Sequence, residues 1–158
     1  MAVVNASGTL TFAGQAVAAE TVVVGGQTYT WRASLAASGD VLIGASAAAS
    51  AQNLFDAING TGTPGTQYHA STPLNSQVRA SAVTATTVVV QSKIGGTIGN
   101  LIASTETMTQ RSWGGATLAG GSGDQAADLK ALLQSSGAQM SAQVAQALAE
   151  IVFDPATV

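Results

Sequence analysis

The sequence predicts an α+β fold, in which a β-rich domain over residues 1–121 is followed by a C-terminal helical segment over residues 122–158. The domain is expected to contain two hairpins, further strands and one packed helix. Short runs rich in valine, threonine and aromatic residues alternate with glycine-containing turns. One run has apolar residues at helical spacing between two capping residues. After Gly123 the character changes, and apolar residues again recur at helical spacing.

The first strand and the first hairpin lie in the N-terminal part of the chain. Residues 8–12 (GTLTF) alternate small or polar residues with large apolar ones, which predicts a strand. Residues 21–24 (TVVV) and 27–33 (QTYTWRA) flank the Gly25-Gly26 pair. Two glycines tolerate the positive φ angles of a two-residue hairpin turn, so these runs are expected to pair.

Two large aromatic side chains share one face of the second hairpin arm. Tyr29 and Trp31 alternate with Thr28, Thr30 and Arg32. A paired aromatic binding surface is one explanation of this pattern. Polar residues opposite aromatic ones are also typical of a half-buried strand. We expect the second explanation to hold, with both aromatic rings facing the core.

A helix is predicted after a short strand at residues 41–43 (VLI). Ser46 is a suitable N-cap, and Gly60 can close the helix in a left-handed conformation. Between these caps, one apolar stripe has helical spacing. Its members are Ala47, Ala51, Leu54, Phe55 and Ile58.

Residues 60–77 (GTGTPGTQYHASTPLNSQ) predict a long surface loop, because glycine, proline and hydroxyl residues occur there without periodicity. Long loops in compact domains often carry function. The loop is therefore a candidate subunit-contact region, with Tyr68 and His69 as its candidate contact residues.

The remaining β-rich segments complete the predicted domain. Residues 78–84 and 86–92 predict a second hairpin. Residues 94–107 are expected to form a glycine-hinged connection with a short apolar segment. Residues 113–121 (WGGATLAGG) are expected to form the last strand, before a flexible glycine-rich hinge.

Two short helices are predicted in the C-terminal segment, at residues 124–137 and 140–152. Their apolar stripes are expected to pack against a neighbouring subunit or against the parent domain. The candidate subunit-contact residues of these stripes are Leu129, Leu132, Leu133, Val144, Leu148 and Ile151.

Charged residues make up 8% of the chain, about a third of the usual share, and the net charge is −3. A chain with so few charges tends to self-associate, so we expect a homo-oligomer. The cations form no basic stripe, which disfavours nucleic acid as a partner. No classical signal peptide and no run of eighteen apolar residues is present, so we expect no membrane association.

The sequence contains no pattern that predicts catalysis, a cofactor or a metal. It has one histidine and no cysteine, and it lacks the G-x-S-x-G and phosphate-loop motifs. Four acidic residues, Glu20, Asp40, Asp56 and Glu106, are well separated and are expected to act as solubilising groups at turns or on a helix face. We therefore expect a protein that is not an enzyme and that has no cofactor.

The order of these segments resembles a domain common in structural proteins of tailed bacteriophages. It is also similar to the small insert domain of flagellin and flagellar cap proteins, in which an Ile-Asn pair likewise follows an amphipathic helix. The segments that carry the resemblance are GTLTFAG at 8–14, ETVVVGGQTYTW at 20–31, DVLIGASAAASAQNLFDAING at 40–60, VRASAVTATTVVVQSKIGGTIGN at 78–100 and WGGATLAGG at 113–121.

The resemblance implies a non-enzymatic component of a phage virion, made in the cytoplasm of the bacterial host. Capsid decoration (cement) and tail association are both compatible with it, and other virion proteins would be the partners. The alternative is a receptor- or glycan-binding module of a tail fibre or cell surface. That alternative would expose Tyr68, His69, Trp31 and Trp113 as stacking groups.

Overall fold

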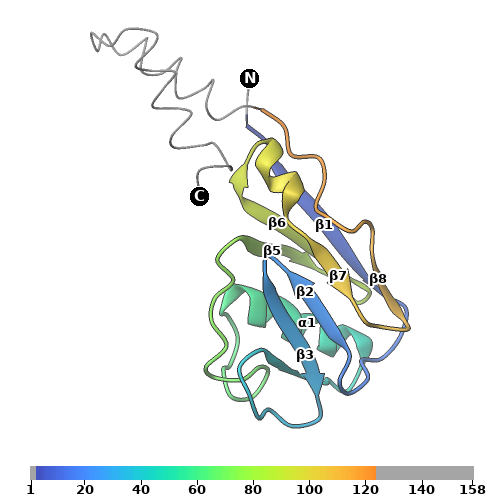
Figure 1. Ribbon diagram of the computed structural model, residues 1–158. Helices are drawn as coiled ribbons and strands as arrows, with labels where there is room; N and C mark the ends of the chain where they lie inside the picture. Colours follow the sequence, from blue (N-terminus) through green and yellow to red (C-terminus); the bar gives the residue numbers. More distant parts are fainter. Residues whose placement is uncertain (1–2, 124–158) are drawn as a thin grey trace, which may run out of the picture.

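The computed structural model describes residues 3–123, which form two four-stranded sheets and one α-helix (Figure 1). The two helices predicted at residues 124–137 and 140–152 lie outside the described residues. In chain order the elements are β1 (Asn5–Phe12), β2 (Thr21–Val24), β3 (Gln27–Arg32), β4 (Asp40–Leu42), α1 (Ala47–Asn59), β5 (Val78–Val83), β6 (Thr87–Gly95), the 3₁₀ helix η1 (Thr97–Leu101), β7 (Ser104–Glu106) and β8 (Arg111–Trp113).

Each sheet contains one of the two hairpins. One sheet has the strand order β5-β6-β1-β8, and the other has the order β4-β3-β2-β7. Helix α1 contacts β4 of one sheet and β5 and β6 of the other, so it helps to join the two sheets. The predicted α+β class, with two hairpins, further strands and one packed helix, is confirmed for residues 3–123.

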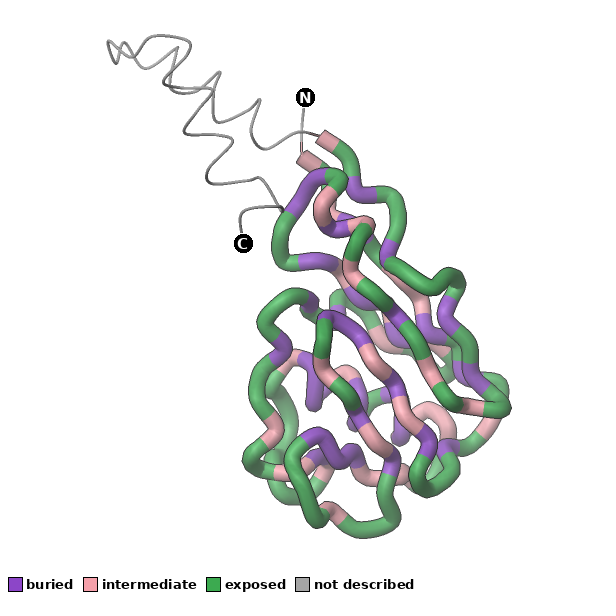
Figure 2. Tube along the Cα trace, viewed as in Figure 1, coloured by how far each residue is buried: buried purple, intermediate pink, exposed green. Residues whose placement is uncertain are grey.

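The first hairpin forms as its turn sequence predicts. Gly25 and Gly26 have φ angles of 58° and 72°, the left-handed region that a tight two-residue turn requires. The arms pair antiparallel, with Val22 opposite Tyr29. Tyr29 and Trp31 are both 0% exposed, which confirms that the aromatic face of β3 belongs to the core. Buried positions recur along the strands and the helix, whereas the loops are mostly exposed (Figure 2).

Helix α1 begins and ends at the predicted caps. The Ser46 hydroxyl accepts a hydrogen bond from the Ala49 amide at 3.1 Å, and Gly60 closes the helix with a φ angle of 64°. Leu54 and Ile58 of the predicted stripe are fully buried, and Phe55 is partly buried against the core.

The second hairpin, β5–β6, also forms as predicted, and β6 pairs further with β1. The prediction of a last strand over residues 113–121 is wrong. The strand is Arg111–Trp113, and the residues after it make isolated bridges, such as Ser7 with Ala119 and Val4 with Ser122. Two Gly-Gly pairs interrupt the segment, and Gly120 has a φ angle of 78°, which breaks an extended run.

The segment predicted as a connection, residues 94–107, contains two elements that the sequence pattern did not reveal. Strand β7 pairs with β2, and η1 packs directly on β6. This close packing requires Gly99, because a Cβ there would lie 2.6 Å from the Ser92 hydroxyl. Neither element has a long enough periodic pattern to be predicted from sequence.

Candidate functional site

The described residues contain no constellation typical of an active site. Within residues 3–123, no group of three or more histidine, aspartate or glutamate side chains is placed to hold a metal ion. None of the helices described is long and apolar enough to cross a membrane. The candidate site is therefore a part of the surface that could contact another molecule.

The loop over residues 60–77 differs from the prediction at Tyr68. Tyr68 is 2% exposed, because a bridge to Val41 draws this part of the loop alongside β4. Burial, together with the nearby Asp56 carboxylate, raises the pKa of the Tyr68 hydroxyl. The expectation that Tyr68 contacts another subunit is thus corrected, since its side chain belongs to the core of its own chain.

The other loop candidate, His69, is partly exposed and takes part in a local turn. Its Nδ1 lies 2.8 Å from the Ser71 hydroxyl and accepts from the Ser71 amide at 3.2 Å. Leu74 is the large apolar side chain that the loop exposes, with 57% of its surface accessible. Sequence reasoning missed Leu74, because nothing local distinguishes an exposed leucine in a loop from a buried one.

The glycan-binding alternative requires exposed aromatic side chains, but the aromatic residues expected to provide them are buried. Trp31 is fully buried, and Trp113 is buried with its indole nitrogen donating to the Thr105 carbonyl at 3.2 Å. With Tyr68 also buried, His69 is the one partly exposed member of that proposed set. The six other candidate contact residues, Leu129, Leu132, Leu133, Val144, Leu148 and Ile151, lie outside the described residues.

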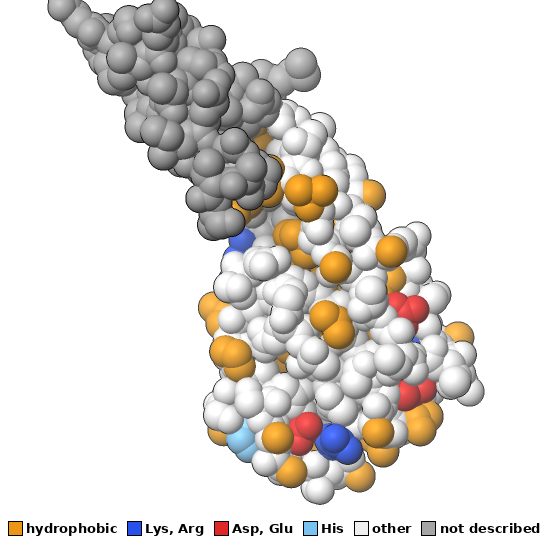
Figure 3. Space-filling view, viewed as in Figure 1, with side chains coloured by type: hydrophobic (Ala, Val, Ile, Leu, Met, Phe, Trp, Pro, Cys, Tyr) orange, Lys and Arg blue, Asp and Glu red, His pale blue; other side chains and the backbone are white. Residues whose placement is uncertain are grey.

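The clearest unexpected feature is the burial of charged groups. Half of the charged side chains of residues 3–123 are inside the fold. Three of the four acids that were expected to be solubilising groups are among them, so that expectation is wrong for these three. The buried ones are Glu20, Asp40, Asp56 and Arg111, and those left at the surface are Arg32, Arg79, Lys93 and Glu106. Few charges are consequently left on the exterior of residues 3–123, and on the face drawn in Figure 3 the charged groups are small and separate.

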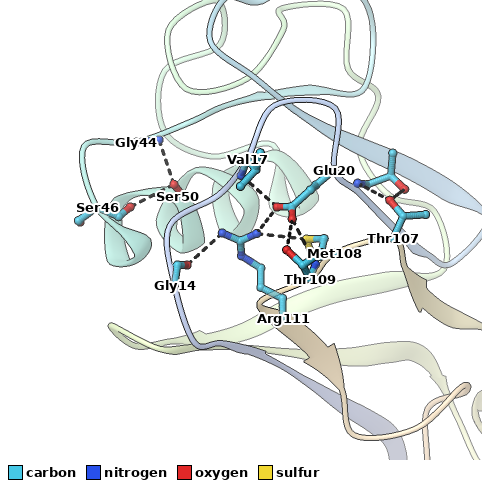
Figure 4. A network of polar contacts seen from close by, with 11 residues as sticks. Gly14, Val17, Glu20, Gly44, Ser46, Ser50, Thr107, Met108, Thr109 and Arg111 are labelled. Atoms are coloured by element: carbon cyan, nitrogen blue, oxygen red, sulfur yellow. Dashed lines mark hydrogen bonds and ion pairs between the residues drawn. The ribbon is translucent and has the colours of Figure 1, made fainter.

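Arg111 and Glu20 form an ion pair between β8 and the turn before β2 (Figure 4). Their nearest atoms are 2.6 Å apart, and the other terminal nitrogen of Arg111 donates to the Gly14 carbonyl at 3.0 Å. The guanidinium also lies over two aromatic rings, 4.9 Å from the centre of Phe12 and 5.3 Å from that of Trp31. These contacts compensate the cost of removing both charges from water.

The Glu20 carboxylate has further partners that hold it ionised. It accepts from the backbone amides of Val17 at 3.0 Å and Thr109 at 3.2 Å. Burial alone would raise the pKa of Glu20, but these two amides and Arg111 together lower it below its usual value. Because Thr109 and Val17 belong to different segments, the carboxylate joins them.

Asp40, at the start of β4, is also a buried carboxylate whose pKa is lowered by hydrogen bonds and by a nearby arginine. Its carboxylate accepts from the amides of Ala36 and Ala37, both at 2.8 Å, and lies 3.5 Å from the Arg32 guanidinium. Burial opposes ionisation, but the two amides and Arg32 lower the pKa of Asp40 below its usual value. These bonds close the short loop that lets β4 run parallel to β3.

Both lowered pKa values predict that the protein loses stability in acid. In the range below about pH 5, the unfolded chain binds protons at Glu20 and Asp40 before the folded chain does. The stabilisation is therefore complete above the unfolded pKa values and is lost as the pH falls through the folded ones. Urea unfolding at a series of pH values from 7 to 3 should show this decline.

One variant identifies the source of that decline. Glu20→Gln should flatten the dependence of the unfolding free energy on pH, because the variant has no carboxylate at this position to bind a proton. Identical acid profiles for the parent and Glu20→Gln would show that the Glu20 carboxylate has the same pKa in the folded and unfolded chains.

The described surface has two exposed apolar features that are candidates for contact with another molecule. One is the exposed face of loop 60–77 around Leu74 and His69. The other is an apolar groove of about 500 Å³ beside η1. The groove is lined by Gly26, Ser76, Gln77, Ile94, Ile98, Gly99, Leu101, Ile102 and Ala103.

The fold and the surface define a β-rich α+β domain with a structured, almost uncharged exterior. Comparisons of the sequence with protein-family models and with curated proteins give no match.

Proposed function

We propose that this chain is a non-enzymatic structural component of a phage virion, a capsid decoration (cement) or tail-associated protein that assembles through multimeric contacts. One observation carries the proposal: the fold of residues 3–123 places half of the charged side chains of that part inside and leaves its exterior with few charges. Such an exterior gives little electrostatic protection against association. A protein of this kind is suited to permanent contact with other copies or other proteins.

Exposed apolar side chains support the same function. Val17, Leu74, Ile94 and Leu101 each expose more than half of their surface. Single exposed apolar residues are common in soluble proteins, but here they lie on a surface with few charges around them. Burying them between subunits would contribute to assembly over many copies.

The resemblance to structural domains of tailed phages directs the proposal to a virion. Other virion proteins of the capsid or tail are the proposed partners, with synthesis in the bacterial host cytoplasm. The proposed subunit contacts are the exposed face of loop 60–77 and the C-terminal apolar stripes. Among residues 3–123 the exposed cations are Arg32 on β3, Arg79 on β5 and Lys93 on β6. So small a number supports our proposal that nucleic acid is not a partner.

Electron cryo-microscopy of particles purified from a host that produces this chain tests the proposal. We expect density that fits residues 3–123 at positions repeated by the symmetry of the capsid or tail. We also expect quantitative mass spectrometry of the same particles to give many copies for each particle. Particles that form without the chain, while it stays in the supernatant of the lysate, would contradict the proposed function.

A further inference from the structure

The apolar groove lies beside η1, which lines it together with the end of β6. Its large apolar members include Ile94, Ile98, Leu101 and Ile102. Ile94 and Leu101 are 53% and 69% exposed, so much of their apolar surface faces solvent. None of the described residues that line the groove is charged. An apolar segment of protein is therefore a better occupant than a charged ligand.

The same 3₁₀ helix holds the last residues that the structure describes. Asn100 of η1 donates to the Gly121 carbonyl at 2.9 Å and accepts from the Gly121 amide at 2.8 Å. Ser122 then pairs with Val4 beside the start of β1 (Figure 1). The described chain therefore ends, at Gly123, close to the element that lines the groove.

The sequence after Gly123 carries an apolar stripe within reach of this groove. Leu129, Leu132 and Leu133 have the spacing of one helix face. Leu129 is six positions beyond Gly123, and six residues of a helix rise about 9 Å. The five residues of η1 extend over about 10 Å. The stripe therefore begins within about one length of η1 from Gly123, which is close enough for it to contact the groove.

The tether favours the chain's own segment over that of a second copy. Gly121 and Ser122 are hydrogen-bonded to η1 and to Val4, so the C-terminal segment starts from a fixed point on its own domain. Covalent attachment over a short distance gives a local concentration in the millimolar range. The same segment of a second copy, present at micromolar concentration, is roughly a thousandfold less concentrated at the groove.

We propose that the groove binds the first part of the C-terminal segment of its own chain. The residues that meet there are Ile94, Ile98, Leu101 and Ile102 of the groove and Leu129, Leu132 and Leu133 of the segment. The inference does not depend on the proposed virion function. It revises the set of subunit contacts proposed above: the first C-terminal stripe covers the parent domain, and the second one, with Val144, Leu148 and Ile151, is left for other subunits.

Cysteine pairs in the full chain test this assignment, because the protein has no cysteine of its own. Leu101→Cys is combined in turn with Leu129→Cys, Leu132→Cys and Leu133→Cys, and each variant is oxidised mildly at micromolar concentration. We expect at least one pair to form an intrachain disulfide, detected by non-reducing electrophoresis and by the mass after thiol alkylation. Circular dichroism checks that each variant is folded.

The control replaces the groove cysteine with one at a distant exposed site. Val17 is 52% exposed and follows the end of β1 opposite to the end that contacts η1. Val17→Cys with the same segment cysteine should oxidise about tenfold more slowly, or slower still. Equal rates for the groove and control pairs would overturn the proposal. Disulfides between two chains in place of intrachain ones would also overturn it, and would assign the groove to a second copy.

Discussion

Replacing Arg111 by methionine is expected to lower the free energy of unfolding by about 3–5 kcal/mol. The substitution leaves the Glu20 carboxylate in a buried site without its guanidinium partner, and it removes the donor to the Gly14 carbonyl. An unpaired buried charge costs far more than a pair contributes. Denaturant unfolding of the parent and Arg111→Met at pH 7 measures the difference.

Two further variants separate the ion pair from a general loss of packing. The double variant Glu20→Gln with Arg111→Met should recover part of the lost stability, because no charge is then left unpaired. Arg79→Met, on the exposed face of β5, should change the unfolding free energy by less than about 0.5 kcal/mol. A loss as small for Arg111→Met as for Arg79→Met would show that the buried ion pair is unimportant for stability.

The elements that could be predicted from the sequence are those with a complete local signal. The glycine pair at residues 25–26 is sufficient to predict the first hairpin, because a tight turn needs two positive φ angles. Helix α1 has a cap at each end, Ser46 and Gly60, and a stripe between them. Alternation along β3 likewise predicted that Tyr29 and Trp31 are buried.

The pairing of distant segments could not be predicted in the same way. β1 lies between β6 and β8, and β3 pairs parallel with β4 through a short loop that Asp40 closes. No local pattern specifies such neighbours, because each strand is equally compatible with several partners. Strand β7 has three residues, too few for a period to be recognised.

Buried charges could not be predicted from the local sequence. Glu20 and Arg111 are 91 positions apart, so their pairing appears only in the fold. The sequence pattern therefore favoured a solubilising role for the Glu20 carboxylate. Tyr68 shows the converse, since an aromatic residue in a loop without periodicity proved to be part of the core. In the structure, charged residues are thus buried that the sequence pattern had placed at the surface, whereas Leu74 is exposed.

Leu74→Asp is expected to weaken self-association of the protein by about 10- to 100-fold. Burial of a leucine side chain contributes about 1.5–3 kcal/mol, and each 1.4 kcal/mol is a factor of ten in the dissociation constant. An aspartate at the same place would also have to lose its hydration in the contact. Leu74 is 57% exposed, so the substitution should leave the fold intact.

Ser81→Asp provides the matched control. Ser81 is exposed on β5, so this substitution adds the same charge at a different place on the surface. It should weaken association much less than Leu74→Asp does. Equal weakening by both variants would indicate a general effect of net charge and would remove loop 60–77 from the contact surface.

The central claim is that an almost uncharged exterior is made to be covered by other copies or other proteins. Sedimentation velocity of the unaltered full chain, over a range from micromolar to near-millimolar concentration, tests it most directly. We predict a sedimentation coefficient that rises with concentration as oligomers form. A coefficient that stays at the value of the monomer over the whole range would contradict the account.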